Sequence, residues 1–277
     1  MNNKEIEGAI LRFLLDQGEN DLFFRHVPKR DRGNVQSSSK NIRSSRKDTS
    51  GMTDSKSKAS KVDFGNRSHR SREIPKELKK LSIELPDIEI TDKKKMLEEY
   101  EAKIKDCMNC RLGKSRTNFV FGEGNPDADV MFIGEAPGKN EDETGKPFVG
   151  RGGQLLTKII EAMEMKREEV FIGNIIKCRP PNNRDPKNDE AAECIDYLLY
   201  QIAVIQPKIL IFLGRIAAHT LLNTKKPMRE LRKTMHKFAG IPAVVTYHPA
   251  ALLRNQAYKR PAWEDMKRVM AFLSDSE

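Results

Sequence analysis

The sequence predicts an α/β fold in which helices cover both faces of a central, mainly parallel sheet of four strands. Short apolar segments rich in Val, Ile and Phe alternate with helical stretches from about residue 82 onward. Residues of unusual chemistry follow these segments, at the sheet edge where α/β proteins bind ligands. A basic segment rich in Ser, Lys and Arg comes before them. We therefore expect a three-layer α/β/α domain preceded by a disordered basic region.

Four apolar segments are the expected strands. They are DVMFIG at 129–134, VFIGNII at 170–176, ILIFLG at 209–214 and AVVTYH at 243–248. Helical patterns span residues 93–107, 154–165, 187–205, 215–223 and 261–273. Because helices separate the strands, we expect the strands to run parallel, with their carboxyl ends at one edge.

The excess positive charge of the chain lies in one segment. Residues 25–72 hold 14 Lys and Arg against 4 Asp and Glu, which accounts for the net charge of +10. This composition buries too little apolar surface to offset chain entropy, so we predict a disordered linker over residues 28–80. The linker is either an electrostatic arm for nucleic acid or a solubilising spacer. The folded domain is expected at residues 82–275.

Residues 1–27 combine a short amphipathic helix with an acidic and aromatic motif. Ile6, Ile10 and Phe13 recur at helical spacing. The segment ENDLFF, residues 19–24, partly resembles peptides that dock on replication sliding clamps, and the alternative is a helix face docked on the main domain. No run of about eighteen apolar residues predicts a membrane span, and the acidic start is unlike a signal peptide. We expect a cytoplasmic protein without a membrane partner.

The cysteines form a C-x-x-C pair and a second, wider pair. They are Cys107, Cys110, Cys178 and Cys194. Four thiolates complete a tetrahedral set for zinc or for an iron–sulfur cluster. Disulfides are disfavoured in the cytoplasm, and a redox pair would leave two cysteines unexplained. The spacing alone leaves zinc and iron–sulfur open, although the wider pair fits a zinc ribbon poorly.

A glycine-rich loop, GEAPGKNEDETGKPFVGRGG at 134–153, joins the first expected strand to a helix. It lacks both the Gly-Lys-Ser/Thr of a Walker motif and the G-x-G-x-x-G of a dinucleotide-binding turn. Its carboxylates would repel the phosphates of a nucleotide, which disfavours a nucleotide-binding α/β protein. A neutral ligand held by backbone N–H groups, with a carboxylate to orient water, suits this composition better.

Three motifs, GEAPGKNEDETGKPFVGRGGQLL, GNIIKCRPPNNRDP and YHPAALLR, together with the interleaved cysteines, resemble the fourth, iron–sulfur family of uracil-DNA glycosylases. The resemblance covers about residues 82–275. It implies a DNA repair enzyme that flips uracil out of single- or double-stranded DNA and hydrolyses its N-glycosidic bond, leaving an abasic site. Such an enzyme would act as a monomer on the DNA of a prokaryotic nucleoid. The alternative is a non-catalytic iron–sulfur module that binds DNA or a polymerase.

The resemblance implies a uracil pocket built from residues of all three motifs. Glu135 and Ala136 would line it, partly through backbone N–H groups, and Phe148 would stack on the extruded base. The Asn174 amide would pair with uracil N3–H and O4. His248 would donate to uracil O2, where negative charge develops as the glycosidic bond breaks, and a neutral imidazole would suffice.

The remaining implied roles concern water, DNA and a metal centre. Glu141 is the carboxylate expected to position the attacking water, with Glu135 as a second catalytic carboxylate. Leu252 and Arg254 would fill the gap in the duplex or hold phosphates. The four cysteines would hold a structural [4Fe–4S] cluster, with zinc as the alternative. His219 and His236 are interpreted as structural or surface residues.

Overall fold

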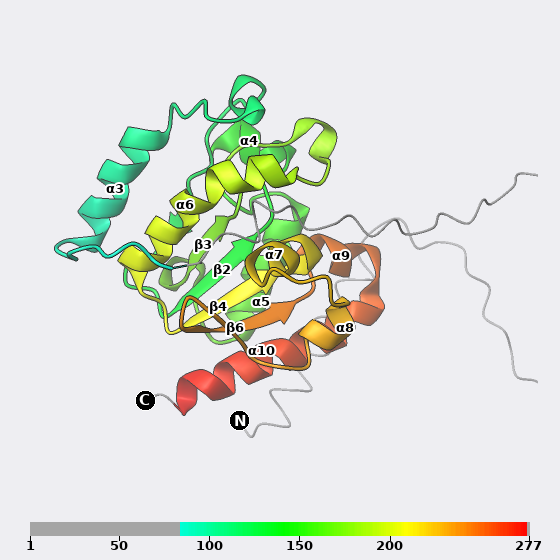
Figure 1. Ribbon diagram of the computed structural model, residues 1–277. Coiled ribbons are helices and arrows are strands. Elements are labelled where there is room, and N and C mark those ends of the chain that lie inside the picture. The colour runs from blue at the N-terminus through cyan, green and yellow to red at the C-terminus, as the bar shows by residue number, and fades with distance from the viewer. Residues whose placement is uncertain (1–83, 276–277) are drawn as a thin grey trace, which may run out of the picture. The chain divides into compact units, whose positions relative to one another are not determined.

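The computed structural model describes residues 84–275, which form a layered α/β domain (Figure 1). The centre is a six-stranded sheet in the order β1-β3-β2-β4-β6-β5. The strands are β1 (Glu123–Gly124), β2 (Val130–Gly134), β3 (Phe171–Asn174), β4 (Ile209–Leu213), β5 (His236–Phe238) and β6 (Ile241–Thr246). The four inner strands are parallel, and β1 and β5 pair antiparallel at the two edges.

The α/β fold and its four parallel strands are confirmed, but the sheet has six strands rather than four. The two additional strands carry little sequence signal. Strand β1 has two residues, Glu and Gly, and β5 reads His-Lys-Phe, so neither contains an apolar run. Edge strands need bury only part of their surface, and such short, polar edges also discourage pairing with other chains.

Helices precede, separate and follow the strands. They are α3 (Lys93–Ile104), α4 (Lys139–Thr144), α5 (Arg151–Ala162), α6 (Asn188–Ile205), α7 (Gly214–Leu221), α8 (Met228–Leu231), α9 (Pro249–Arg254) and α10 (Lys259–Ser274). Short 3-10 turns are η1 (Arg111–Lys114), η2 (Arg167–Glu169), η3 (Pro181–Asn183) and η4 (Gln256–Tyr258). The five predicted helices are present, although α3 ends three residues early. The short α4, α8 and α9 were not predicted, because six residues or fewer cannot show a helical period.

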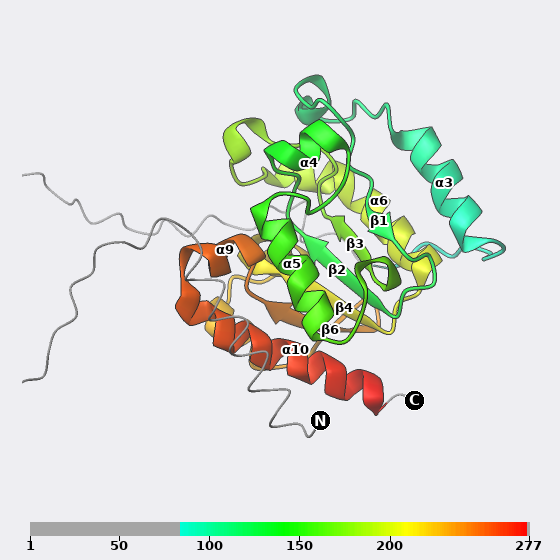
Figure 2. The same ribbon diagram turned by 180° about the vertical axis from the view of Figure 1, so that it is seen from behind.

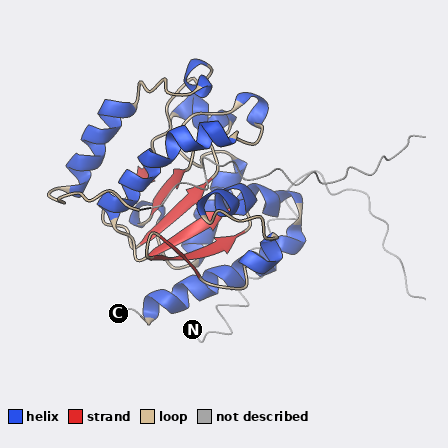
Figure 3. Ribbon diagram, viewed as in Figure 1, coloured by secondary structure: helices blue, strands red, loops and turns tan. Residues whose placement is uncertain are grey.

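Alternate side chains of the strands supply two separate hydrophobic cores. Figure 3 shows the strands at the centre of the domain with helices around them. Met131 and Ile133 of β2 face a core that includes α6 and α7, whereas Val130 and Phe132 face a core that includes α5 and α10. Figure 2 shows α5 and α10 across the second face. Burial on both faces explains why these strands read as continuous apolar runs.

The N-terminal predictions lie outside the described residues. The amphipathic helix and docking motif of residues 1–27 and the linker of residues 28–80 therefore remain predictions. In the part of the chain that the structure describes, no helix is both long and apolar enough to span a bilayer.

Candidate active site

A cleft of about 700 Å³ opens at the carboxyl ends of the parallel strands. Residues from all three sequence motifs line it, because each motif follows a different strand of the sheet. Among them are Glu135 after β2, Asn174 at the end of β3, and His248 after β6. The sheet therefore brings together residues that lie far apart in the sequence.

Gly134, the last residue of β2, is the point where the side chains of Asn174 and Phe148 meet. A Cβ atom at this position would lie 2.4 Å from Asn174 Oδ1 and 2.5 Å from Phe148 Cζ. The Phe148 ring in turn lies 5.6 Å from the His248 ring, centroid to centroid, with a 31° tilt. Glycine is thus needed here for space, so that the Phe148 ring and the Asn174 amide can both approach the end of β2.

Asn174 presents an unsatisfied acceptor to this end of the cleft. It pairs with Gly134 in the sheet register and is only 2% exposed. Its Oδ1 atom is buried and accepts no hydrogen bond from any residue that the structure describes. A buried acceptor without a donor costs about 1–3 kcal/mol, so its retention indicates that a ligand supplies the donor.

Phe148 is buried but holds an unusual backbone conformation. Its φ angle is +51°, in the left-handed region that side chains other than glycine rarely adopt. Gly153, in the first turn of α5, makes room for this bend, since a Cβ there would lie 1.8 Å from the Phe148 carbonyl oxygen. The loop is therefore shaped to turn the Phe148 ring towards Asn174 and His248.

His248 caps α9 and stays neutral near physiological pH. Its Nδ1 atom accepts a hydrogen bond from the Ala250 amide at 3.2 Å, which places the ring proton on Nε2. The pKa of His248 is lowered to about 4, mainly by burial and then by the nearby Arg254, against a smaller opposing effect of Glu141. Gly214, at φ +92°, leaves room for the His248 Cβ. The site therefore contains a neutral imidazole whose N–H donor is at Nε2.

Glu135 is a half-buried carboxyl group that lines the cleft beside Ala136. The pKa of Glu135 is raised to about 7, mainly by burial and then by the nearby Asp185, whereas Arg215 opposes the rise. Near neutral pH the group exchanges between a proton donor and a base. The Glu135 carbonyl is fixed by the Ile176 amide at 3.1 Å.

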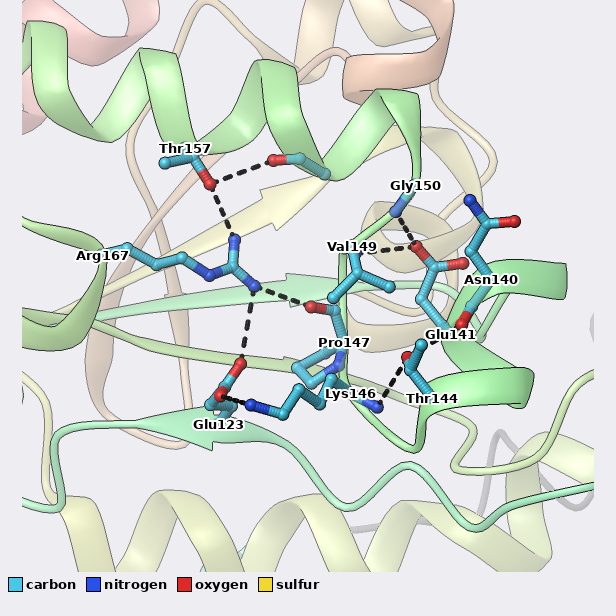
Figure 4. Close-up of polar contacts among 11 residues, drawn as sticks. Glu123, Asn140, Glu141, Thr144, Lys146, Pro147, Val149, Gly150, Thr157 and Arg167 are labelled. Carbon is cyan, nitrogen blue, oxygen red and sulfur yellow. Dashed lines mark hydrogen bonds and ion pairs between the residues drawn. The ribbon is translucent and has the colours of Figure 1, made fainter.

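Glu141, on α4, accepts hydrogen bonds from three backbone amides of its own loop, and Figure 4 shows the contacts with Val149 and Gly150. Its Oε1 atom accepts from the Val149 and Gly150 amides, both at 2.9 Å. Its Oε2 atom accepts from the Gly138 amide at 3.1 Å. The side chain therefore holds the glycine-rich loop together. That Glu141 also positions the attacking water remains a prediction.

The two residues predicted to contact DNA differ in exposure. Arg254 lines the cleft at the end of α9. Leu252 is only 2% exposed and packs with Leu155 and Ala262, so it could enter a duplex only by leaving this cluster. The next residue, Leu253, is 41% exposed. Nothing in the local sequence pattern distinguishes the two leucines.

Two arginines that were not predicted as site residues form a basic rim along the cleft. Arg184 and Arg215 both line it. Arg184 binds both oxygens of the buried Glu190, at 2.8 and 2.6 Å, and Arg215 pairs with Asp185 at 3.1 Å. Their positions could have been noticed, since Arg184 and Asp185 lie in the GNIIKCRPPNNRDP motif and Arg215 follows directly after β4.

The four cysteines are all unbridged thiols: Cys107 and Cys110 follow α3, Cys178 follows β3, and Cys194 lies within α6. Several donors point at their sulfurs: Tyr197 Oη at 3.1 Å and the Asn109 amide at 3.5 Å to Cys107, Arg116 at 3.3 Å to Cys178, and the Lys177 amide at 3.4 Å to Cys194. Hydrogen bonds to sulfur are typical of metal-bound thiolates. Within residues 84–275, however, no three His, Cys, Asp or Glu side chains form a ready metal-binding group.

Comparison with a family model defines the class of protein. The model of the uracil DNA glycosylase superfamily matches residues 121–267, just over half of the chain. This range contains β2, β3, β4 and β6 and all three motifs that line the cleft.

Curated relatives define the group within this class. A type-4 uracil-DNA glycosylase of Saccharolobus solfataricus is 48% identical over 182 residues, which are 62% of this chain and 83% of the relative. A type-4 enzyme of Thermotoga maritima is 40% identical over 185 residues, 65% of this chain and 96% of the relative. A third, from Archaeoglobus fulgidus, is 38% identical over 184 residues, 62% and 91% of the two chains. The chain therefore belongs to the type-4 uracil-DNA glycosylases.

Proposed function

We propose that this protein excises uracil from DNA by hydrolysing the N-glycosidic bond and leaving an abasic site. The observation that carries the proposal is the unpaired, buried Oδ1 of Asn174 close to the Phe148 ring, which in turn lies beside the His248 ring. The relatives of this chain are named type-4 uracil-DNA glycosylases, which is the activity proposed here. Bases are not accessible in a duplex, so the target nucleotide must first flip into the cleft.

Recognition of the base rests on Asn174 and Phe148. The Asn174 Oδ1 accepts from uracil N3–H, and its amide nitrogen donates to O4. Cytosine has an acceptor at N3 and a donor at C4, so it leaves buried groups unpaired and is rejected. Stacking on Phe148 contributes about 1–3 kcal/mol and offsets part of the cost of unstacking the base.

His248 stabilises the departing base. Negative charge grows on uracil as the bond to the sugar breaks, and a donor fixed near O2 lowers the energy of that state. A neutral imidazole with its proton on Nε2 can donate there without a change of protonation. We expect excision to be insensitive to the titration of His248 above about pH 5.

Two carboxylates are proposed to handle the attacking water. Glu141 is the first. Among the described residues, its Oε2 atom accepts one hydrogen bond, from the Gly138 amide. Because a carboxylate oxygen can accept more than one hydrogen bond, Oε2 can also accept one from a water molecule. Glu135 is the second, since its raised pKa suits a group that takes up a proton near neutrality. In Glu141→Gln the side-chain oxygen can still accept hydrogen bonds from the Val149 and Gly150 amides. A large loss of excision rate without a loss of folding stability would therefore support the role of Glu141 in water activation.

The DNA strand is proposed to follow the basic rim of the cleft. Arg184, Arg215 and Arg254 lie there and can contact phosphates. We propose that Leu253, rather than the buried Leu252, fills the space left by the flipped base. Leu253→Ala should then weaken excision from duplex DNA more than from single strands, because only a duplex has a gap to fill.

The four cysteines are proposed to hold a [4Fe–4S] cluster, with zinc as the alternative. The fit rests on four reduced thiols with hydrogen-bond donors already directed at three of their sulfurs. When bound, the cluster would serve as a structural crosslink between α3, β3 and α6. Absorbance near 400 nm and iron analysis of protein purified without oxygen distinguish it from zinc.

Partners beyond DNA are proposed from residues outside the described range. The segment 19–24 would dock on a sliding clamp, and the linker 28–80 would add electrostatic affinity for DNA at a prokaryotic nucleoid. The protein would act as a monomer. Removal of residues 1–80 should reduce the salt dependence of DNA binding and leave excision at low salt intact.

The test of the proposed function is release of uracil. The protein is incubated with a labelled oligonucleotide that carries one uracil, and abasic sites are cleaved with hot alkali. We expect a product band at uracil and none with thymine in its place. Absence of a band from a protein that binds the DNA and absorbs near 400 nm would overturn the enzymatic function and favour a DNA-binding module.

A further inference from the structure

The position of Phe148 depends on a loop that is held from both sides. Its left-handed backbone conformation is intrinsically unfavourable for a residue with a Cβ, so other contacts must maintain it. On the C-terminal side, Glu141 binds the amides of Val149 and Gly150. On the N-terminal side, the contact comes from Arg167, which lies 20 residues further along the chain.

Arg167 joins this loop to α5 through a fixed guanidinium (Figure 4). Its Nη2 atom donates to the Pro147 carbonyl at 2.7 Å, and its Nη1 atom donates to Thr157 Oγ1 at 3.0 Å. Thr157 is itself anchored, because its hydroxyl donates to the Gly153 carbonyl at 3.3 Å. One planar group therefore sets the distance between the loop and the helix that Phe148 packs against.

A carboxylate lies beside the guanidinium nitrogen that donates to Pro147. Glu123, in β1, lies 3.8 Å from Arg167 Nη2 and 3.1 Å from Lys146 Nζ. The Arg167 side chain is only 22% exposed, whereas the Lys146 side chain is 62% exposed. A partly desolvated, multiply bonded arginine holds its geometry more firmly than a surface ion pair does.

We propose that Arg167 is a positioning residue for the base-stacking ring of Phe148. It does not line the cleft, so it acts through the Pro147 carbonyl and the left-handed turn that follows. The inference rests on the proposed function, since it assigns Phe148 the role of stacking on uracil. A displacement of about 1 Å in a group that orients a substrate can reduce the rate up to about a hundredfold.

The test is a double-mutant cycle between Arg167 and Phe148. Arg167→Met should lower the single-turnover excision rate about ten- to a hundredfold, and Arg167→Lys should restore part of it by donating to Pro147. In a Phe148→Ala background, Arg167→Met should change the rate by less than about twofold. Equal losses in both backgrounds, or no loss in either, would overturn the proposal.

Lys146→Met is the matched control, because it removes the other cation from Glu123 and leaves the Pro147 contact in place. It should leave the excision rate within about twofold of the unmodified protein. Melting curves of all variants separate a loss of folded protein from a loss of rate in folded protein.

Amide hydrogen exchange over residues 145–153 gives a readout independent of catalysis. Arg167→Met should speed exchange there, and Lys146→Met should not. If the unmodified protein excises no uracil while Arg167→Met speeds exchange, the proposed function fails and the loop contact stands. If it excises uracil and exchange in this loop is unchanged by Arg167→Met, the role of Arg167 fails and the proposed function stands.

Discussion

The cleft and the cysteine region differ in how completely the polypeptide alone arranges their functional groups. In the cleft, Phe148 and Asn174 converge on Gly134, and the His248 ring lies beside Phe148. The cysteines lie in the segments that follow α3 and β3 and within α6, and within residues 84–275 they do not form a ready metal-binding group. The sheet register therefore positions the cleft residues directly, whereas the proposed cluster would have to supply the final link between elements of the cysteine region.

The largest expected effect is on the cleft. Asn174→Ala should lower the rate of uracil excision on the order of 10³-fold, because both proposed hydrogen bonds to the base are lost. Stability should stay the same or rise by about 1 kcal/mol, since an unpaired buried acceptor is removed. Single-turnover excision and urea denaturation measure the two quantities.

Asn125→Ala is the matched control for Asn174→Ala. Asn125 lies in the turn between β1 and β2, where its Oδ1 accepts from the Asp127 amide at 2.9 Å. This variant should excise uracil at the unmodified rate and lose up to about 1 kcal/mol of stability. A comparable loss of excision in both variants would contradict the assignment of base recognition to Asn174.

The second effect is on the cysteine region and concerns stability. Cys194→Ser should abolish absorbance near 400 nm and lower the free energy of unfolding by about 3 kcal/mol, the scale expected when a crosslinking metal centre is lost. For a domain of this size the melting temperature should fall by about 10 °C. Differential scanning calorimetry on protein prepared without oxygen measures the shift.

The comparison predicts that some excision survives the loss of the cluster. Excision by Cys194→Ser below its melting temperature should be reduced far less than in Asn174→Ala, because the sheet still orients the cleft. Complete loss of activity in folded Cys194→Ser would show that the two regions are not separable.

A third, smaller effect tests the space at Gly134. Gly134→Ala places a Cβ 2.4 Å from Asn174 Oδ1 and 2.5 Å from Phe148 Cζ, so both groups must shift. We expect about a hundredfold loss of excision and about 1–3 kcal/mol of destabilisation. Gly173→Ala is the control, since its Cβ would meet no atom closer than 3.8 Å. Similar rates for the two variants would refute the role of Gly134.

The smallest expected effect is a pH dependence of stability. The pKa of Glu135 is raised from 4.5 to about 7, so the folded state keeps its proton while the unfolded chain loses it. Stability therefore falls as pH rises from about 4.5 to 7, and Glu135→Gln should remove that fall. Relative to the unmodified protein, the variant should gain about 1–2 kcal/mol between pH 5 and pH 8, after allowance for partial exposure.

Urea denaturation at the two pH values measures this change. Glu143→Gln, at an exposed position of the same loop, is the control and should show no pH-dependent gain. A gain of the same size in Glu143→Gln would attribute the effect to the net charge of the loop rather than to the burial of Glu135.

The sequence by itself determined the parallel core of the fold and the edge at which the cleft lies. Four doubly buried strands leave continuous apolar runs, and helices between them leave a regular alternation. Since parallel strands end at one edge, residues at or just after their carboxyl ends, such as Glu135, Asn174 and His248, could be grouped from the order of the segments alone. These features depend on local pattern and chain direction.

Only the tertiary structure decided which neighbours each side chain meets. Leu252 and Leu253 are neighbouring leucines that the sequence pattern does not distinguish. In helix α9, however, Leu252 packs in a cluster with Leu155, whereas Leu253 is exposed. Glu141 could be recognised as a polar loop residue, but not as the acceptor of three backbone amides. The role of Arg167 could not be predicted from the sequence, because its contact with Pro147 depends on the packing of two segments that lie 20 residues apart. Such contacts arise from the folded geometry of the whole domain, which no local periodicity records.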